Sequence, residues 1–130
     1  MPITLQNRPG HNIYFISHEG EVSDNEFLTF YFQFLQSDGF DASKNMLIDL
    51  READSSPRSA NTLRQFAVFV KDQLNDLKTQ PKVAVVAPRS LSFGLARMYQ
   101  SFALTVPWDF LVFRAIDAAL VWLGVPEDII

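Results

Sequence analysis

Hydrophobic and polar residues near the start of the chain follow the pattern of two short strands. The runs Ile3–Leu5 and Asn12–His18 are rich in β-branched and aromatic residues, and Arg8-Pro9-Gly10 lies between them. Such runs on either side of a turn predict a β-hairpin. Gly20 breaks the second run, so we expect the strand to end there.

The next segment changes to a helical pattern. Ser23 or Asp24 is a suitable N-cap, and Glu26 follows Ser23 by three residues, as in a capping box. These residues predict a helix over residues 25–36. The pair Asp38-Gly39 is expected to stop it.

The rest of the chain repeats a strand followed by a helix. Brief apolar runs between turn signals predict strands at residues 46–50, 82–87 and 110–113. The strongest helical period follows the first of these strands. Its apolar residues recur at intervals of three and four: Leu63, Phe66, Ala67, Val70, Leu74 and Leu77.

Two further helices are predicted by shorter patterns of the same kind. We expect Ser90 to cap the first, and Gly124 to follow the second. The expected inward residues of the first are Leu91, Leu95, Met98 and Phe102. Those of the second are Ile116, Ala119, Leu120 and Leu123.

This order predicts an α/β fold. The elements read ββαβαβαβα, and strict alternation in the later part implies right-handed crossovers onto a mixed, mostly parallel sheet of about five strands with four helices. A chain of 130 residues suits one hydrophobic core. We therefore expect a single domain over residues 1–130.

Composition narrows the function classes. The net charge is −4 and the pI near 5.0, which argues against nonspecific nucleic-acid binding. The chain has no Cys, so disulfides, a thiol nucleophile and thiolate metal sites are excluded. The first residues show no basic region followed by an apolar run, so we expect no secretory signal, and no apolar run approaches the length of a membrane span. We expect a cytoplasmic protein without a transmembrane segment.

Three segments resemble the STAS/SpoIIAA-like family of sulfate-transporter and anti-sigma-factor-antagonist domains, especially its small stand-alone bacterial members. They are Met46–Arg51, Lys82–Ala87 leading into Phe93–Met98, and Val112–Leu123, where an apolar strand runs into an Ala-rich helix ending in Trp-Leu. The resemblance implies a SpoIIAA-like (STAS) fold. It also implies a domain that works by protein–protein contact, sometimes with a nucleotide or lipid.

In some family members a serine after the central strand is phosphorylated, and the corresponding region here is Asp54–Pro57. Pro57 follows Ser56 where the regulatory members have Gly. The start of the next helix also suits an anion, because free N–H groups and the helix dipole favour negative charge there. The candidate phosphorylation or anion-binding residues are Ser55, Ser56, Ser59 and Arg58. Simple N-capping is the alternative.

A second candidate site is apolar. The helix over residues 25–36 carries apolar side chains over roughly 200° of its circumference, about twice what a surface helix needs. Such a surface could contact a partner protein, a second copy in a homodimer, or a lipid or other apolar ligand, unless the chain itself covers it. The residues in question here and on later helices are Leu28, Phe32, Leu35, Phe69, Phe93 and Trp122.

Other polar residues give weaker signals. His11 and His18 lack partners at metal-ligand spacing, so no metal site is expected. Asp49 lies inside an apolar run, but no Ser-His partner or second spaced carboxylate accompanies it. Arg89-Ser90 with Arg97 could form a small anion site, or only an exposed cap.

The sequence therefore predicts a non-enzymatic regulatory or protein-binding module, without catalytic residues or a cofactor, and with serine phosphorylation as a candidate switch. The alternative is a carrier or sensor of a lipid or other apolar small molecule.

Overall fold

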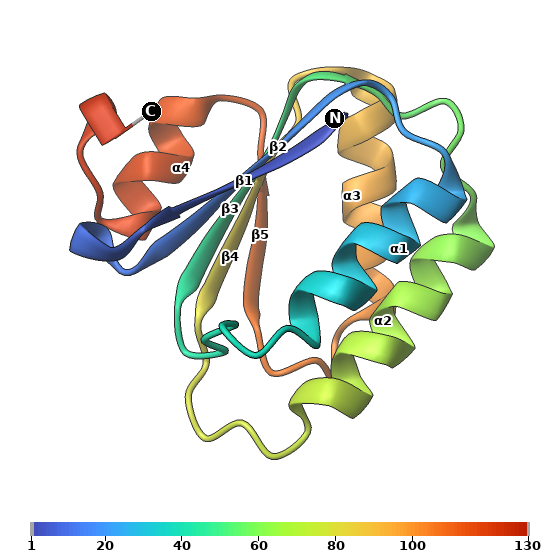
Figure 1. Ribbon diagram of the computed structural model, residues 1–130. Coiled ribbons are helices and arrows are strands. Elements are labelled where there is room, and N and C mark those ends of the chain that lie inside the picture. The colour runs from blue at the N-terminus through green and yellow to red at the C-terminus, as the bar shows by residue number, and fades with distance from the viewer. Residues whose placement is uncertain (1, 130) are drawn as a thin grey trace.

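The computed structural model describes residues 2–129. Within that range the chain forms a five-stranded mixed sheet and four α-helices (Figure 1), which confirms the α/β class and the order ββαβαβαβα. The strands are β1 (Ile3–Arg8), β2 (Ile13–Glu21), β3 (Asn45–Asp54), β4 (Lys82–Val86) and β5 (Asp109–Phe113). The helices are α1 (Asp24–Leu35), α2 (Ala60–Leu74), α3 (Ser90–Phe102) and α4 (Ile116–Leu123).

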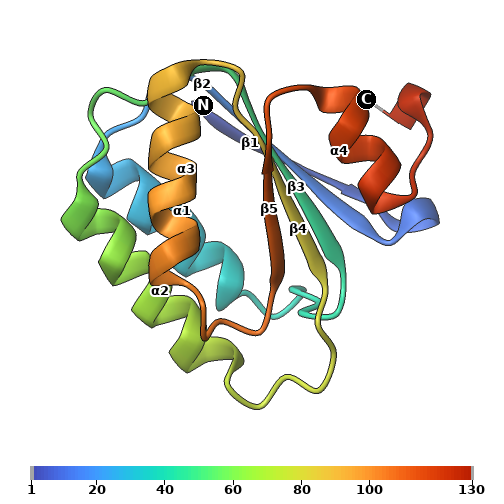
Figure 2. The same cartoon turned by 180° about the vertical axis from the view of Figure 1, so that it is seen from behind.

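The strands lie in the sheet in the order in which they occur in the chain. β1 is antiparallel to β2, and β2, β3, β4 and β5 are parallel. Crossovers of one hand between successive parallel strands place their helices on the same face of the sheet. Accordingly α1, α2 and α3 cover one face, and α4 lies on the other, as the views from both sides show (Figures 1 and 2).

Each face of the sheet has its own hydrophobic core. The larger core lies under α1, α2 and α3 and contains residues such as Ile16, Tyr31 and Val70. The smaller core lies under α4 and contains residues such as Leu47 and Leu120. Strands β3 and β4 contribute to both, as expected for central strands whose two faces are covered.

The predicted start of α1 is confirmed by its hydrogen bonds. The Glu26 N–H donates to Ser23 Oγ over 3.1 Å, and the Ser23 N–H donates to Glu26 Oε1 over 3.1 Å. This is a complete capping box. The expectation that Gly20 ends the preceding strand is wrong, because β2 continues to Glu21. Gly20 adopts a φ of 65°, which a glycine accepts without steric cost, so the strand passes through it.

The inward face of α3 also differs from the prediction. Leu91 and Met98 are 53% and 37% exposed, whereas Ser92, Ala96 and Tyr99 are buried. Tyr99 fits between Phe66 and Phe110, with both ring centroids 5.2 Å from its own. The small side chains of Ser92 and Ala96 on the same side let the helix approach the sheet. Ser90 is the first residue of α3, and its N-cap is Arg89.

No helix within residues 2–129 is long and apolar enough to cross a membrane.

Candidate functional site

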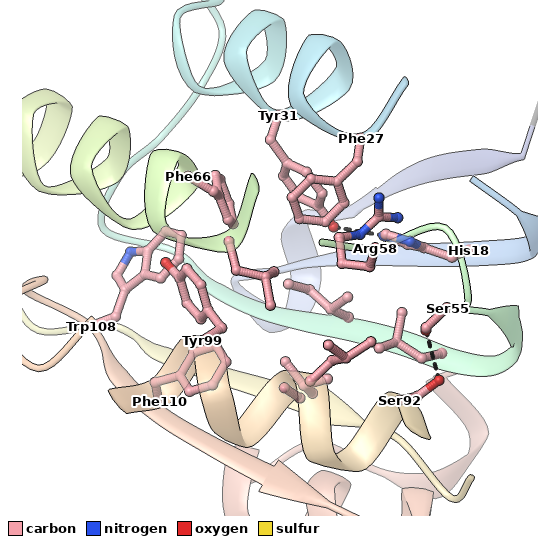
Figure 3. A pocket seen from close by; sticks show the side chains of 16 residues that line it. His18, Phe27, Tyr31, Ser55, Arg58, Phe66, Ser92, Tyr99, Trp108 and Phe110 are labelled. Carbon is pink, nitrogen blue, oxygen red and sulfur yellow. Dashed lines mark hydrogen bonds between the residues drawn. The ribbon is translucent and has the colours of Figure 1, made fainter. Parts of the chain in front are cut away.

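A pocket of about 70 Å³, partly open to solvent, lies at the larger core, between the sheet and α1, α2 and α3 (Figure 3). Strand residues such as Ile48 and Val85 form its floor, and helix residues such as Phe66 and Ala96 form its walls. Its full lining is His18, Phe27, Tyr31, Ile48, Leu50, Ser55, Arg58, Leu63, Phe66, Val85, Ser92, Leu95, Ala96, Tyr99, Trp108 and Phe110. The lining is therefore predominantly apolar and aromatic, as is usual for small-molecule sites.

The pocket runs along α3. Ser92 and Tyr99 lie about 10 Å apart along the helix axis, because each residue of an α-helix rises about 1.5 Å. In Figure 3, Ser92, Ser55 and His18 lie at one end of the row of side chains, and Tyr99 and Trp108 lie at the other. The first end is at the carboxyl ends of the parallel strands, where β2, β3 and β4 lead into the loops before α1, α2 and α3.

Aromatic rings form a continuous wall of the pocket. The Phe27 and Tyr31 ring centroids are 5.0 Å apart, and Tyr31 is in turn 5.0 Å from Phe66. Phe66 stacks on Tyr99 at 5.2 Å, and Tyr99 contacts Phe110. These separations are those of favourable aromatic pairs. Residues of α1, α2, α3 and β5 are thus joined through one set of side chains.

His18 and Tyr31 form a buried polar pair in this wall. His18 Nε2 and Tyr31 Oη are 2.8 Å apart, and both side chains are almost completely buried. Burial, with a smaller contribution from the positive charge of Arg58, lowers the pKa of His18 to about 4. Burial also raises the pKa of Tyr31. Both side chains are therefore neutral at pH 7.

Arg58 is held at the edge of the pocket by three contacts. Its guanidinium donates to Asp24 Oδ1 over 2.8 Å and to the Val22 carbonyl over 3.0 Å. It also lies 4.2 Å from the centroid of the Phe27 ring. Burial acts to raise the pKa of Asp24, but hydrogen bonds, first of all from Arg58, lower it. An anion near this loop would thus compete with Asp24 for the guanidinium.

The three predicted serines lie close together on the loop from β3 to α2 but have different surroundings. Ser55 Oγ is 2.7 Å from Ser92 Oγ, which ties the loop to the first turn of α3. Ser59 caps α2 by accepting the Thr62 N–H over 3.1 Å, so the capping interpretation describes its geometry. Ser56 is exposed, and its N–H donates to Asp54.

The structure brings only part of the predicted apolar surface together. Leu35 is 5% exposed and belongs to the larger core, so its assignment to a surface is wrong. Leu28 is half-buried against the same core. Phe32 and Phe69 contact each other with tilted rings, 4.1 Å between centroids, because α2 packs beside α1. Contacts within the chain itself therefore cover most of the broad apolar surface that the sequence predicted for this helix.

The other two predicted surface residues lie on opposite faces of the sheet. Phe93 of α3 is half-buried with the Arg114 guanidinium 4.0 Å from its ring centroid. Trp122 of α4 packs against Phe113. The large apolar side chains that are exposed lie elsewhere: Leu5, Val68, Leu91, Met98, Leu104, Leu111 and Val121.

The remaining candidates are separate from the pocket. Asp49 is buried on the α4 face and makes a two-pronged ion pair with Arg51, whose Nη2 lies 2.9 Å from Asp49 Oδ2. Beside them is a polar groove of about 290 Å³. Arg89 donates to the Ala53 carbonyl, and Arg97 is exposed. No three carboxylates or imidazoles within residues 2–129 converge as a metal site requires.

Sequence reasoning missed the residues that give the pocket its polar character, namely His18, Tyr31, Ser92 and Tyr99. The available signal was the spacing of Ser92, Ala96 and Tyr99 at i, i+4 and i+7, which is a helix face. The helix face through Leu91 and Met98 is more hydrophobic in sequence, so it was predicted to face inward in place of the face through Ser92, Ala96 and Tyr99. Comparisons of the chain with protein-family models and with curated proteins found no match.

Proposed function

We propose that this domain is a non-enzymatic carrier or sensor that binds a small apolar molecule in the pocket between the sheet and α1, α2 and α3. The observation that carries this proposal is the pocket itself, a space of about 70 Å³, partly open to solvent and lined mainly by apolar and aromatic side chains. Protein interiors are ordinarily filled to the density of organic crystals. An apolar space of this kind favours an apolar occupant.

The size of the cavity limits the occupant. An engineered apolar cavity of about 150 Å³ in another protein holds benzene. The pocket here is about half as large, so the molecule is smaller than benzene unless the lining moves. Ser55 is half-buried, and its movement would enlarge the pocket at the carboxyl ends of the strands.

The polar groups at the end of the pocket near Ser55 favour a binding function over a catalytic one. His18 is hydrogen-bonded to Tyr31, and Ser55 to Ser92. Arg58 is paired with Asp24. Because each of these groups already has a partner, the pocket can accept an apolar molecule without leaving them unsatisfied.

Xenon under pressure tests the pocket directly, because xenon enters apolar cavities without needing polar contacts. In ¹H–¹⁵N spectra of the wild-type protein, we expect shifts centred on pocket residues of α2, α3 and β3. Ala96→Leu fills the space from α3 and should abolish them. The matched control is Ala118→Leu, which adds the same side chain at an exposed position of α4.

Two results would contradict the proposal. One is a wild-type spectrum that does not respond to xenon, and the other is an equal response in Ala96→Leu. Native mass spectrometry of protein purified from its own host adds a second measurement. A bound small molecule that is lost in Ala96→Leu but kept in Ala118→Leu supports the proposal.

The resemblance to the STAS/SpoIIAA-like family leads to a second proposal, that the domain is a regulatory module of that family switched by phosphorylation. Ser56 and Ser59 are both exposed, but the Ser59 hydroxyl caps α2 and contacts Thr62, and the Ser55 hydroxyl contacts Ser92, which favours Ser56 as the acceptor. A phosphate would add a charge of about −1.5 to −2 beside the pocket edge. A lysate kinase should label the wild type and Ser59→Ala but not Ser56→Ala. Equal labelling of Ser56→Ala, or an unlabelled wild type, would overturn this proposal.

A further inference from the structure

We propose that residues 55–58 form a strap that closes the pocket over its occupant, with the hydrogen bond between Ser55 and Ser92 as its latch. This inference rests on the proposed binding function and adds how entry to the same site is controlled. It follows from the place of this segment in the lining and from the unequal contacts at its two ends.

Residues 55–58 are the part of the lining that can move most easily. The lining comes mainly from helices and strands, whose backbone hydrogen bonds hold their residues in place. The exceptions are Ser55 and Arg58, on the loop between β3 and α2, and Trp108, just before β5. Trp108 is 7% exposed, whereas Ser55 is half-buried. Residues 55–58 therefore both reach solvent and can move without breaking a helix or a strand.

The Arg58 end of this segment is firmly held to the start of α1. The guanidinium donates to Asp24 and to the Val22 carbonyl, and it lies on the Phe27 ring. The Ser59 N–H also donates to Asp24 Oδ1, over 3.2 Å. The Arg58 side chain is only 7% exposed, so water competes little for these contacts. This end is therefore the fixed end of the strap.

The Ser55 end is held to α3 by one side-chain hydrogen bond. Ser55 Oγ lies 2.7 Å from Ser92 Oγ, and a dashed line joins the two atoms in Figure 3. The Arg58 N–H donates to the Ser55 carbonyl over 2.9 Å, which makes residues 55–58 a compact turn. Because the Ser55 end has the weaker attachment, we expect the turn to swing away from α3 while it stays attached to α1.

The same hydrogen bond favours the closed arrangement. Ser92 is 2% exposed, and a buried hydroxyl without a partner is costly. Ser55 supplies that partner when the strap is closed. When the strap opens, water must reach the Ser92 hydroxyl in its place. Opening is therefore possible but unfavourable, as retention of a bound molecule requires.

An engineered disulfide tests the strap, because the chain contains no cysteine of its own. In the double variant Ser55→Cys/Ser92→Cys, oxidation should link the turn to α3, since the two replaced oxygens are 2.7 Å apart. The measurement is the exchange rate of xenon between the pocket and water, by ¹²⁹Xe saturation-transfer NMR. We expect oxidation to lower this rate about 10-fold, because it removes the locally open state. Reduction of the same sample should restore the faster exchange.

Ser55→Ala is the complementary variant, because it breaks the latch without a covalent link. The loss of one hydrogen bond should speed xenon exchange about 5-fold. The matched control is Ser56→Ala, which makes the same substitution at the exposed neighbour in the same turn. This control should keep the wild-type rate within about 2-fold.

The outcomes separate the strap from the binding function. If xenon does not bind the wild type, the binding function and the strap both fail. If xenon binds, but neither oxidation of the double variant nor Ser55→Ala changes its exchange rate, the pocket binds ligands and the strap is wrong. Should the disulfide not form, the comparison of Ser55→Ala with Ser56→Ala decides, and equal rates in these two variants would overturn the inference.

Discussion

On the face of the sheet covered by α1, α2 and α3, the most deeply buried polar pair is neutral, whereas on the α4 face the corresponding buried group is part of an ion pair that borders a polar groove. His18 and Tyr31 represent the first arrangement. Asp49 and Arg51 represent the second, with 40% of the Arg51 side chain exposed. The difference follows from coverage, because a charge is costly to bury unless water or a partner reaches it.

The comparison also separates two kinds of empty space. The face under α1, α2 and α3 contains a small, mostly apolar pocket, and the α4 face carries a larger groove lined mainly by polar residues. Water fills a polar groove readily, whereas an apolar cavity of this kind gains more from an apolar molecule. Mutations on the two faces should therefore respond differently to added ligands and to pH.

The largest expected effect comes from enlarging the cavity. Phe66→Ala should lower the free energy of unfolding by about 3–5 kcal/mol, because it removes a buried ring and leaves a void. Added benzene should restore part of this loss, since the void joins the pocket. Urea unfolding with and without benzene measures both effects. Leu120→Ala in the α4 core is the control. If benzene restored the stability of this variant equally, the proposed difference between the two faces would be wrong.

The second effect is a pH dependence due to His18. The unfolded chain takes up a proton near pH 6.5, but the folded protein does so only near pH 4. Stability is therefore lost as the pH falls from about 6.5 to about 4, by about 3 kcal/mol in total. His18→Gln should flatten the stability profile in this window. His11→Asn, at an exposed position, should leave the profile as in the wild type.

The smallest effect is expected in the groove. Arg51→Ala removes the ionic partner of Asp49, but the carboxylate keeps the Arg51 backbone N–H at 3.0 Å and contact with water. The expected loss is about 1 kcal/mol, as for other solvent-accessible ion pairs. Denaturant unfolding at low and high salt measures it. A loss of about 3 kcal/mol or more would mean that the pair behaves as an enclosed one, against the contrast drawn between the faces.

Local signals in the sequence predicted the fold well. The capping box at Ser23 and Glu26 depends on residues three positions apart, and the apolar run of β4 reflects burial on both faces. The cap at Gly124 likewise follows from one residue, whose φ is 72°. These features are visible without knowledge of what packs against them.

The site could not be predicted in the same way, because its properties arise from contacts between distant residues. Arg58 was expected to be a free cation for an anion, but Asp24 lies 34 residues away in sequence and holds it. Tyr99 is buried in the pocket wall because its ring packs between Phe66 of α2 and Phe110 of β5, which are distant in sequence. Leu35 was assigned to the surface because the pattern of α1 does not show which apolar residues the chain covers.

The order of the strands has a consequence for how the molecule assembles. Every strand pairs only with its neighbours in the chain, so the domain can grow from the first hairpin toward its C-terminus, one β–α unit at a time, as it leaves the ribosome. The lining of the pocket, however, includes Phe110, which belongs to β5, the last strand of the sheet to be synthesised. A molecule bound there would consequently report that synthesis of the sheet has been completed.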